Sequence, residues 1–230
     1  MKDEYLTILH TTPLFTGIKA EALAVMMDCL RPTVSNFPKS SYIITEGEKY
    51  AGMGILLTGE AAIFKENSTG GRIIMEMLTA GGMFGEMIVF STRQFWPASV
   101  TAQTESTVMF LPPEKITGQC QNLCACHKEL IKNILRIISD KAVTLNRKVE
   151  YLAMRGVRQK ICAYLWEQYI ISGKDTFMTP LNRNELAEFL NISRTALSRE
   201  MGRMRDDGLI DFYRTSVKIK NPADLRRQAE

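Results

Sequence analysis

The sequence predicts an α+β protein: an antiparallel β sandwich or barrel, then a long helix, then two short helices with a two-stranded wing. Three observations predict it: glycine-punctuated β-rich runs up to Pro112, a heptad pattern after them, and helix-capping residues near the C-terminus. The 230 residues are 45% hydrophobic and 23% charged, as in ordinary globular proteins. One large domain or two small ones are therefore expected.

The N-terminal half contains β-rich runs that are separated by glycines such as Gly47, Gly59 and Gly85. Glycine suits the turns between strands because it readily adopts positive φ. Many short strands at near-regular spacing imply a compact antiparallel sheet structure. A helix at Glu21–Leu30 is expected to pack outside it. The predicted strands are Tyr42–Thr45, Ile55–Thr58, Ala61–Lys65, Ile73–Leu78, Ala98–Thr101 and Thr107–Leu111.

Beyond these strands, apolar residues recur with heptad spacing, which predicts a long helix with a dimer seam. An amphipathic helix that lies on its own domain's core would show the same spacing over so few heptads, so both interpretations stay open here. Gly156 follows the seam and is predicted to be a hinge, because glycine adopts backbone angles that other residues avoid. The seam positions are Ile131, Leu135, Ile138, Ala142, Leu145, Val149 and Leu152.

The C-terminal third begins with an amphipathic helix at Val157–Ile171 and continues with a capping signal. Asn182, followed three residues later by Glu185, forms a capping-box pattern. This pattern predicts a short helix that runs through Leu190.

A second short helix is predicted directly after a tight turn. Asn191 tolerates the left-handed turn conformation, and Ser193 is a favourable N-cap for a helix that reaches about Arg205. The sequence Asp206-Asp207-Gly208 ends this helix. A two-stranded wing is then expected from Ile210–Tyr213 and Val217–Lys220, joined by Arg214-Thr215-Ser216.

The second short helix has one apolar and one polar side. Leu197, Met201 and Met204 form an inward stripe at i, i+4 and i+7. Two short helices that present Arg, Thr and Ser in this way are typical of a helix-turn-helix that reads the DNA major groove. A solvated polar face on a small helical module is the alternative. The opposite side carries Thr195, Ser198 and Arg199, with Arg194 on its flank.

The charge of the chain is unevenly distributed. Residues 1–154 hold 15 basic and 15 acidic side chains, whereas 155–230 hold 14 basic and 10 acidic ones. The whole formal charge of +4 therefore belongs to the C-terminal third. This excess favours double-stranded DNA as a partner of the predicted helix-turn-helix.

Several other classes of protein are disfavoured. The longest stretch without a charged residue, Tyr5–Ile18, is shorter than the roughly 20 apolar residues that span a membrane. There is no secretory pattern, and the 5 cysteines fit a reducing compartment, so we expect a cytoplasmic protein without a membrane partner. An enzyme is not expected, since phosphate-loop, HExxH and GxGxxG motifs are missing. Cys126 and His127 are neighbours that would lie on different faces of a helix, which disfavours a nucleophile pair.

The segment Asn182–Ile210 resembles the winged helix-turn-helix of the cyclic-AMP receptor protein and fumarate-nitrate regulator family of bacterial transcription factors. The motifs at Glu46–Glu48, Gly59 and Gly81–Met87 are similar to that family's sensor domain, and Ile131–Leu152 resembles its dimerisation helix. The similarity covers nearly the whole chain, and the order and spacing of the motifs make it specific.

This resemblance implies an architecture of three parts. Residues 1–115 would form a β-roll sensor domain of the cupin-like jelly-roll type, and 116–154 a dimerisation helix and hinge. Residues 155–230 would form the winged helix-turn-helix. The implied function is an effector-responsive regulator that binds a palindromic operator as a homodimer. RNA polymerase is a further partner that the resemblance implies.

The resemblance also implies which residues meet DNA. Arg194, Thr195 and Arg199 match base-reading positions, and Ser193 matches a phosphate contact. The family's usual glutamate is replaced by Thr195, which cannot accept a hydrogen bond from a cytosine amino group as a carboxylate does, so a different operator sequence is expected. The full set of expected DNA-binding residues is Arg183, Ser193, Arg194, Thr195, Ser198, Arg199, Arg214 and Lys218.

The sensor domain departs from the cyclic-nucleotide members of the family. Their cassette holds the cyclic phosphate with an arginine, and Trp96 stands at that position here. Since a buried phosphate would lack its counter-charge, we expect a small organic effector other than cyclic AMP. Met53, Met75, Met77, Met83 and Met87 would line its pocket or simply fill the core. The expected pocket comprises Gly85, Glu86, Met87, Trp96, Ala98, Ser99, Leu145 and Asn146.

Cysteines offer the alternative sensor. Cys120, Cys124 and Cys126, with His127 beside them, suggest thiol-based or iron–sulfur redox sensing, with Cys29, Cys162 or His127 as a possible fourth ligand. The iron–sulfur members of the family place most of their ligands in an N-terminal tail that this chain lacks. Buried packing is the commoner role of such cysteines. No metal site, haem or other cofactor is therefore expected.

Overall fold

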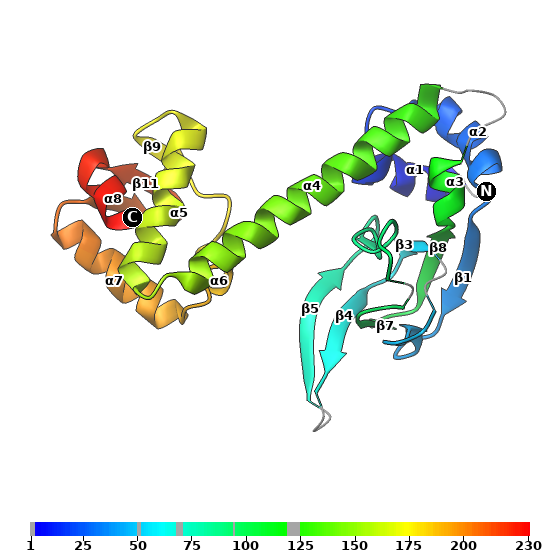
Figure 1. The fold of residues 1–230 in the computed structure, drawn as a ribbon, viewed down its shortest axis with the longest axis horizontal. Coiled ribbons are helices and arrows are strands. Elements are labelled where there is room, and N and C mark those ends of the chain that lie inside the picture. Colours follow the sequence, from blue (N-terminus) through cyan, green and yellow to red (C-terminus); the bar gives the residue numbers. More distant parts are fainter. Residues whose placement is uncertain (1–2, 50–51, 68–70, 94, 119–124) are drawn as a thin grey trace. The chain divides into compact units, whose positions relative to one another are not determined.

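The computed structural model describes residues 3–49, 52–67, 71–93, 95–118 and 125–230, and it divides into two compact units (Figure 1). The first unit ends at Asp140 and the second begins at Lys141, within the helix α4 (Ala125–Ala153). No helix in the described residues is both long enough and apolar enough to cross a membrane.

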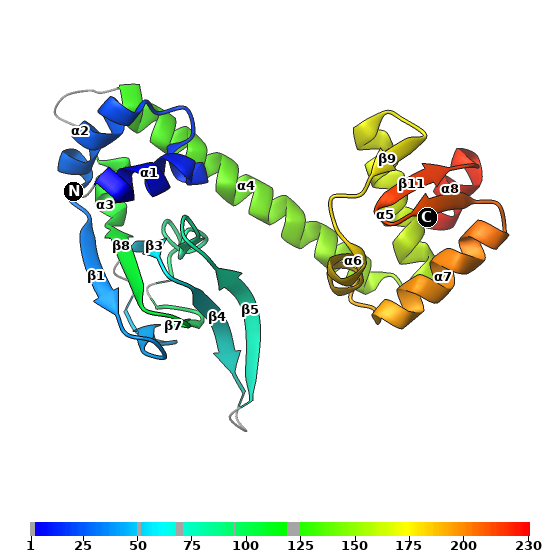
Figure 2. The same cartoon turned by 180° about the vertical axis from the view of Figure 1, so that it is seen from behind.

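The first unit is built from two antiparallel four-stranded sheets, in the orders β1-β8-β3-β6 and β2-β7-β4-β5. The helices α1, α2 and α3 gather at one end of these sheets (Figure 2). The elements are α1 (Asp3–Thr11), the 3-10 helix η1 (Pro13–Phe15), α2 (Ala20–Leu30), β1 (Thr33–Phe37), β2 (Tyr42–Ile44), β3 (Met53–Thr58), β4 (Ala61–Glu66), β5 (Arg72–Leu78), β6 (Met83–Phe84), β7 (Ser99–Ala102), β8 (Ser106–Leu111) and α3 (Pro113–Thr117).

The predicted fold class is confirmed, and the six predicted strands of this unit agree with the structure to within two residues at each end. The elements α1, η1, β1, β6 and α3 were not predicted. β1 has a polar, exposed composition, and β6 has only two residues, so neither shows a period that can be recognised. Both become strands through their partners, β8 and β3.

Close packing explains why glycine occupies position 54 in β3 and position 59 in the turn that follows β3. A Cβ atom at Gly54 would lie 2.1 Å from the Phe84 ring, so only glycine lets that ring cover the strand. Gly59 has a φ of 86°, and a Cβ there would lie 2.4 Å from the Glu105 carbonyl oxygen. Phe84 also packs against Phe110 and Trp96, with ring centroids 6.1 and 5.9 Å away. These contacts form the core between the sheets.

The second unit contains the end of α4 followed by a helical module with a small sheet. The sheet has the antiparallel order β10-β11-β9, so the predicted two-stranded wing gains a third strand. Neither β9 nor the last helix was predicted. The elements are α5 (Val157–Ser172), β9 (Thr176–Met178), α6 (Arg183–Phe189), α7 (Arg194–Asp206), β10 (Ile210–Tyr213), β11 (Ser216–Ile219) and α8 (Pro222–Ala229).

The predicted helix caps are confirmed. Asn182 accepts hydrogen bonds from the backbone of Asn184 and Glu185, while the Glu185 carboxylate accepts one from the Asn182 backbone at 2.7 Å. Asn191 has a left-handed φ of 50°, as the turn between α6 and α7 requires. The Ser193 hydroxyl accepts a hydrogen bond from the Ala196 backbone at 3.1 Å and begins α7.

The helix α4 has two different apolar sides. Leu130 and Ile134 are buried in the core of the first unit, and the Asn133 amide donates to the carbonyl oxygens of Leu14 and Thr16 at 3.0 and 2.7 Å. Most residues of the predicted seam are exposed instead, whereas Ile131 and Ile138 are half-buried. The exposed seam residues are Leu135, Ala142, Leu145, Val149 and Leu152.

Gly156, the predicted hinge, has ordinary backbone angles in this structure. This residue has φ −98° and ψ 137°, which is ordinary extended backbone, and it serves as the N-cap of α5. A Cβ atom there would meet its nearest neighbour, the Gln159 Cβ, at 3.7 Å, an ordinary contact. Gly156 therefore uses no glycine-only backbone angles in this conformation, and its role as a hinge stays a prediction.

Candidate nucleic-acid interface

The helix α7 presents one buried and one exposed side. Leu197, Met201 and Met204 are fully buried in the core of the second unit, as the i, i+4, i+7 spacing predicts. The other side is open to solvent from the first turn onward and carries hydroxyl and guanidinium donors. The exposed residues on it are Arg194, Thr195, Ser198 and Arg199.

A buried lysine of α5 binds the C-terminal end of α6. The Lys160 side chain is only 8% exposed, and its Nζ donates to the carbonyl oxygen of Leu190, at the C-terminal end of α6, at 3.2 Å. A cation is favourable at this end of a helix, where carbonyl groups lack partners. Lys160 therefore stabilises the turn that leads into α7.

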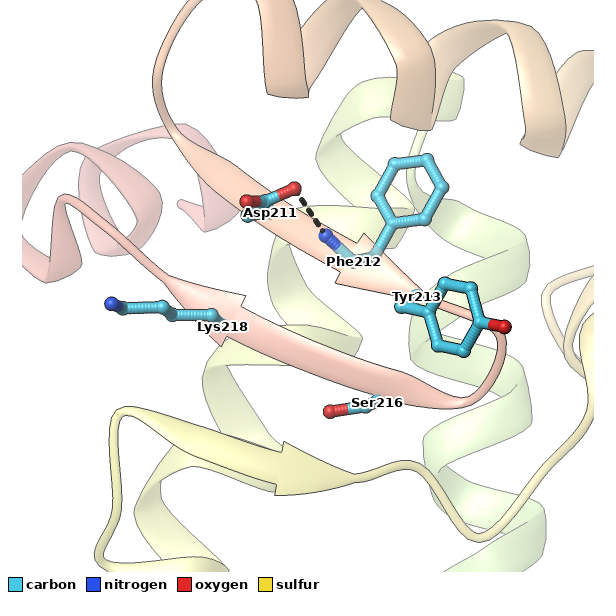
Figure 3. Close-up of a pocket in the computed structure, with 5 residues that line it drawn as sticks. All are labelled: Asp211, Phe212, Tyr213, Ser216 and Lys218. Carbon is cyan, nitrogen blue, oxygen red and sulfur yellow. Dashed lines mark hydrogen bonds between the residues drawn. The ribbon is translucent and has the colours of Figure 1, made fainter.

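The wing adds two further cations. Arg214 occupies the tip with a left-handed φ of 53°, and its guanidinium lies 5.4 Å from the centre of the Tyr213 ring. Lys218 is exposed on β11. It lines a shallow hollow on the β10–β11 hairpin, together with Asp211, Phe212, Tyr213 and Ser216 (Figure 3).

Arg183 does not share the exposed position of the other expected DNA-binding residues. Its guanidinium lies 4.7 Å from the centre of the Phe212 ring and contacts the Met201 sulfur. Its Nη2 atom is buried and has no hydrogen-bond partner among the described residues. Burial lowers its pKa, because a desolvated guanidinium is less stable in its charged form. Arg183 therefore packs against the module in this structure, and its contact with DNA stays a prediction.

The expected effector residues of the first unit are mostly buried. Trp96 packs in the core against Phe84, and the Ser99 hydroxyl accepts a hydrogen bond from the Glu46 backbone at 2.9 Å. Glu86 and Ala98 are also buried, Gly85 has a φ of 83°, and Met87 is half exposed.

An open hollow lies beside Trp96. It is lined by Thr92, Arg93, Phe95, Trp96 and Pro97, and it therefore combines aromatic surface with one cation. The other two expected pocket residues, Leu145 and Asn146, are exposed residues of the second unit, where Asn146 donates to Glu150 at 2.9 Å. Their part in the pocket stays a prediction.

The methionines separate into two groups. Met53 and Met83 are buried core residues, as the simpler interpretation expects. Met75, Met77 and Met87 are at least 50% exposed.

The structure describes only some of the cysteines of the alternative thiol sensor. Cys120 and Cys124 lie outside the described residues, whereas Cys126 is half-buried against the core of the first unit and His127 is buried. In the described part of the chain, no three His, Cys, Asp or Glu residues are grouped as metal ligands. Burial raises the pKa of Cys162 to about 11, so this thiol stays protonated and unreactive near neutral pH.

Comparisons with known families agree with this geometry. A model of the cyclic nucleotide-binding domain matches residues 34–122, and a model of the Crp-like helix-turn-helix domain matches residues 159–228. Together the two matches span more than two thirds of the chain. The chain belongs to the cyclic-AMP receptor protein and fumarate-nitrate regulator (CRP/FNR) family.

Curated relatives in the CRP/FNR family are transcription regulators. The cAMP-activated global transcriptional regulator CRP of Pasteurella multocida is 20% identical over 190 residues, which are 81% of this chain and 89% of that protein. The global nitrogen regulator of Nostoc sp. is 20% identical over 205 residues, which are 86% of this chain and 89% of that protein. This CRP/FNR protein is accordingly a transcription regulator with a DNA-binding helix-turn-helix.

Solved structures share the CRP/FNR fold. The catabolite activator protein of Thermus thermophilus matches with a TM-score of 0.54 and 19% identity, over 95% of this chain and 98% of that chain. CprK in complex with OCPA matches with a TM-score of 0.59 and 16% identity, over 89% and 92%.

Proposed function

We propose that this CRP/FNR regulator reads an inverted-repeat operator as a homodimer and is controlled by a small organic effector other than cyclic AMP. The observation that carries the DNA part is the exposed polar side of α7, backed by a fully buried apolar stripe and flanked by the wing cations Arg214 and Lys218.

In this proposal, Arg199 reads a guanine. A guanidinium can donate two hydrogen bonds to the O6 and N7 atoms of a guanine in the major groove, while Thr195 and Ser198 reach bases or phosphates. Arg194 is a further base-reading residue, whereas Ser193, Arg214 and Lys218 neutralise or contact the phosphate backbone and so fix the register of the protein on DNA. Because Thr195 lacks a carboxylate, the operator would not require a cytosine amino group at that position.

The inverted repeat follows from the proposed dimer. The exposed seam of α4 would pair with the same seam of a second copy, and a two-fold axis would then relate the two recognition helices. Such helices enter successive major grooves about 34–36 Å apart. A bound dimer would be placed to contact RNA polymerase at a promoter.

The effector proposal starts from Trp96. Relatives that are named as cAMP-activated suggest a cyclic nucleotide as the effector. Here, however, a buried tryptophan stands where those relatives are expected to have the arginine that binds the phosphate. The hollow beside it, with Arg93 and Phe95, would suit a small aromatic or aliphatic acid. Native mass spectrometry of the purified protein should reveal a bound small molecule, and an increase in DNA affinity on adding cyclic AMP would contradict this proposal.

The DNA proposal is tested by comparing two cations. Arg199→Ala should lose about 1–3 kcal/mol of binding free energy on a duplex selected from a random pool, and should relax the preference at one base pair. Lys218→Ala should weaken binding to every sequence alike and reduce the salt dependence, because it would remove a phosphate contact.

Fluorescence anisotropy with the selected duplex and a shuffled duplex, over a range of salt concentrations, measures both effects. Equal losses for the two variants on both duplexes would refute the assignment of Arg199 to base reading.

A further inference from the structure

One arginine at the start of α5 holds the recognition helix at two points. Arg158 Nε lies 2.6 Å from Glu200 Oε1, and its Nη2 binds Asp207 Oδ2. Glu200 lies in the middle of α7, and Asp207 is the C-cap of the same helix. A single rigid guanidinium therefore joins α5 to two carboxylates that are two helical turns apart.

The surrounding packing alone fixes α7 less strictly. Ile161, Cys162 and Leu165 of α5 share one buried cluster with the apolar stripe of α7. Burial of apolar surface is non-directional, whereas a forked arginine imposes both distance and angle on its acceptors. The Arg158 guanidinium, which binds both carboxylates, therefore makes a directional contact between these two helices.

The fork lies next to the proposed base-reading residue. Glu200 directly follows Arg199 in the sequence, so a rotation of α7 that displaces the Glu200 carboxylate also turns the Arg199 side chain. Glu200 points inward, with its side chain 14% exposed, whereas Arg199 is exposed. The two side chains thus leave the same turn of α7 in different directions.

We propose that Arg158 is a positioning residue for sequence recognition, which sets the rotation of α7 and so aims Arg199 and Thr195 at the base edges. This inference rests on the proposed reading of DNA by α7. Base contacts require hydrogen bonds of good distance and angle, whereas non-specific binding depends mainly on positive charge. Loss of the fork should consequently reduce selectivity more than overall affinity.

Arg158→Lys tests this with the charge retained, because a lysine ammonium cannot reproduce the planar fork. Relative to wild type, the variant should bind the selected duplex about tenfold more weakly, while its binding to a shuffled duplex changes less than about twofold. The slope of log affinity against log salt should stay the same, since no phosphate contact is removed. Anisotropy titrations of the full chain measure all three quantities.

Arg203→Lys is the control. Arg203 also contacts Glu200, at 3.4 Å, but its side chain is 65% exposed and it lies on α7 itself, so it cannot fix this helix against α5. Its substitution should leave the selectivity unchanged. Glu200→Gln removes the carboxylate charge that pairs with Arg158, and it should reproduce the loss of selectivity seen with Arg158→Lys.

The outcomes separate this inference from the proposed function. If the wild-type protein selects no duplex from the pool, the DNA-reading proposal itself fails. If wild type selects a duplex and Arg158→Lys keeps full selectivity, or Arg203→Lys loses as much, the positioning role is refuted. Should Arg158→Lys fail to fold by circular dichroism, the selectivity of Glu200→Gln decides in the same way.

Discussion

Two arginines of the helix-turn-helix carry the same charge in opposite surroundings. Arg199 is exposed on α7, whereas Arg183 is half-buried over one ring of the module. That ring, Phe212, also meets Arg205, whose guanidinium lies 5.3 Å from its centre. The described residues include no carboxylate in an ion pair with Arg183. A partly desolvated cation without a counter-charge costs folding free energy, so its apolar stem and flat face explain its place better than its charge.

We therefore expect Arg183→Met to leave the free energy of unfolding unchanged or to raise it by about 1 kcal/mol, since methionine keeps the packing and removes the desolvated charge. The salt dependence of duplex binding should not change. Lys218→Met, at an exposed position assigned to a phosphate contact, should instead reduce the slope of log affinity against log salt by about 1. Urea denaturation and anisotropy give the two measurements, and a slope reduced by about 1 in Arg183→Met would show that Arg183 does contact phosphate.

At the scale of elements, the end of α4 is part of the DNA-binding unit. The Tyr151 hydroxyl donates to Glu167 on α5 at 3.1 Å, and its ring lies 5.4 Å from that of Phe189 on α6. Arg147 forms an ion pair with the same Glu167. Burial raises the pKa of Tyr151, because the phenolate would be desolvated beside a carboxylate. The last turns of α4, which precede Gly156, are thus anchored to α5 and α6, which follow it.

This anchoring predicts different results for two substitutions. Gly156→Ser should raise the free energy of unfolding by up to about 1 kcal/mol, because serine is a better N-cap at these backbone angles and restricts the unfolded chain. Tyr151→Phe should lower it by about 1–2 kcal/mol through loss of the hydrogen bond to Glu167. Urea titrations at pH 7, followed by tryptophan fluorescence, check both values.

The effect of Tyr151 should depend on pH in one direction. The folded protein favours the neutral hydroxyl, so its contribution is complete below the ordinary tyrosine pKa of about 10 and is lost as the pH rises above it. For the other variant, a strong loss of stability in Gly156→Ser would contradict the expectation that this position tolerates a side chain.

At the scale of the whole molecule, α4 leaves an apolar stripe that one chain does not cover. Val149 and Leu152 are 63% and 56% exposed, and Leu135 is 57% exposed further along the same heptad positions. The side of α4 that is buried in the first unit is centred on other residues, Leu130 and Ile134, and of the seam residues Ile138 also packs against that core. A second copy with the same stripe is the partner that heptad spacing fits.

We expect sedimentation of a dimer at micromolar concentration, and a shift towards monomer when Leu145 and Val149 are both replaced by glutamate. The charges would be desolvated in the seam and would face the same charges of the second copy. Val143→Glu is the control, because Val143 is 51% exposed but lies outside the seam positions. A monomer for wild type, with and without its selected duplex, would contradict the proposed homodimer.

The sequence by itself determined the local features of this protein. The capping box at Asn182, the left-handed Asn191 and the Ser193 cap depend on residues within three or four positions of one another, so composition and spacing suffice to predict them. The strands with alternating or continuous apolar residues were predictable for the same reason. The inward stripe of α7 follows from the helical period alone.

Only the tertiary structure decided which residues cover one another. Arg183 and Arg199 are the same residue type in the sequence, and Arg183 is half-buried because it packs against Phe212 and Met201. β9 is a strand because β11 lies beside it, and the fork of Arg158 joins residues more than 40 positions apart. Hydrophobic periodicity shows which face of a helix or strand will be buried, but not which residues will cover it. The covering residues come from distant segments that meet only when the chain folds.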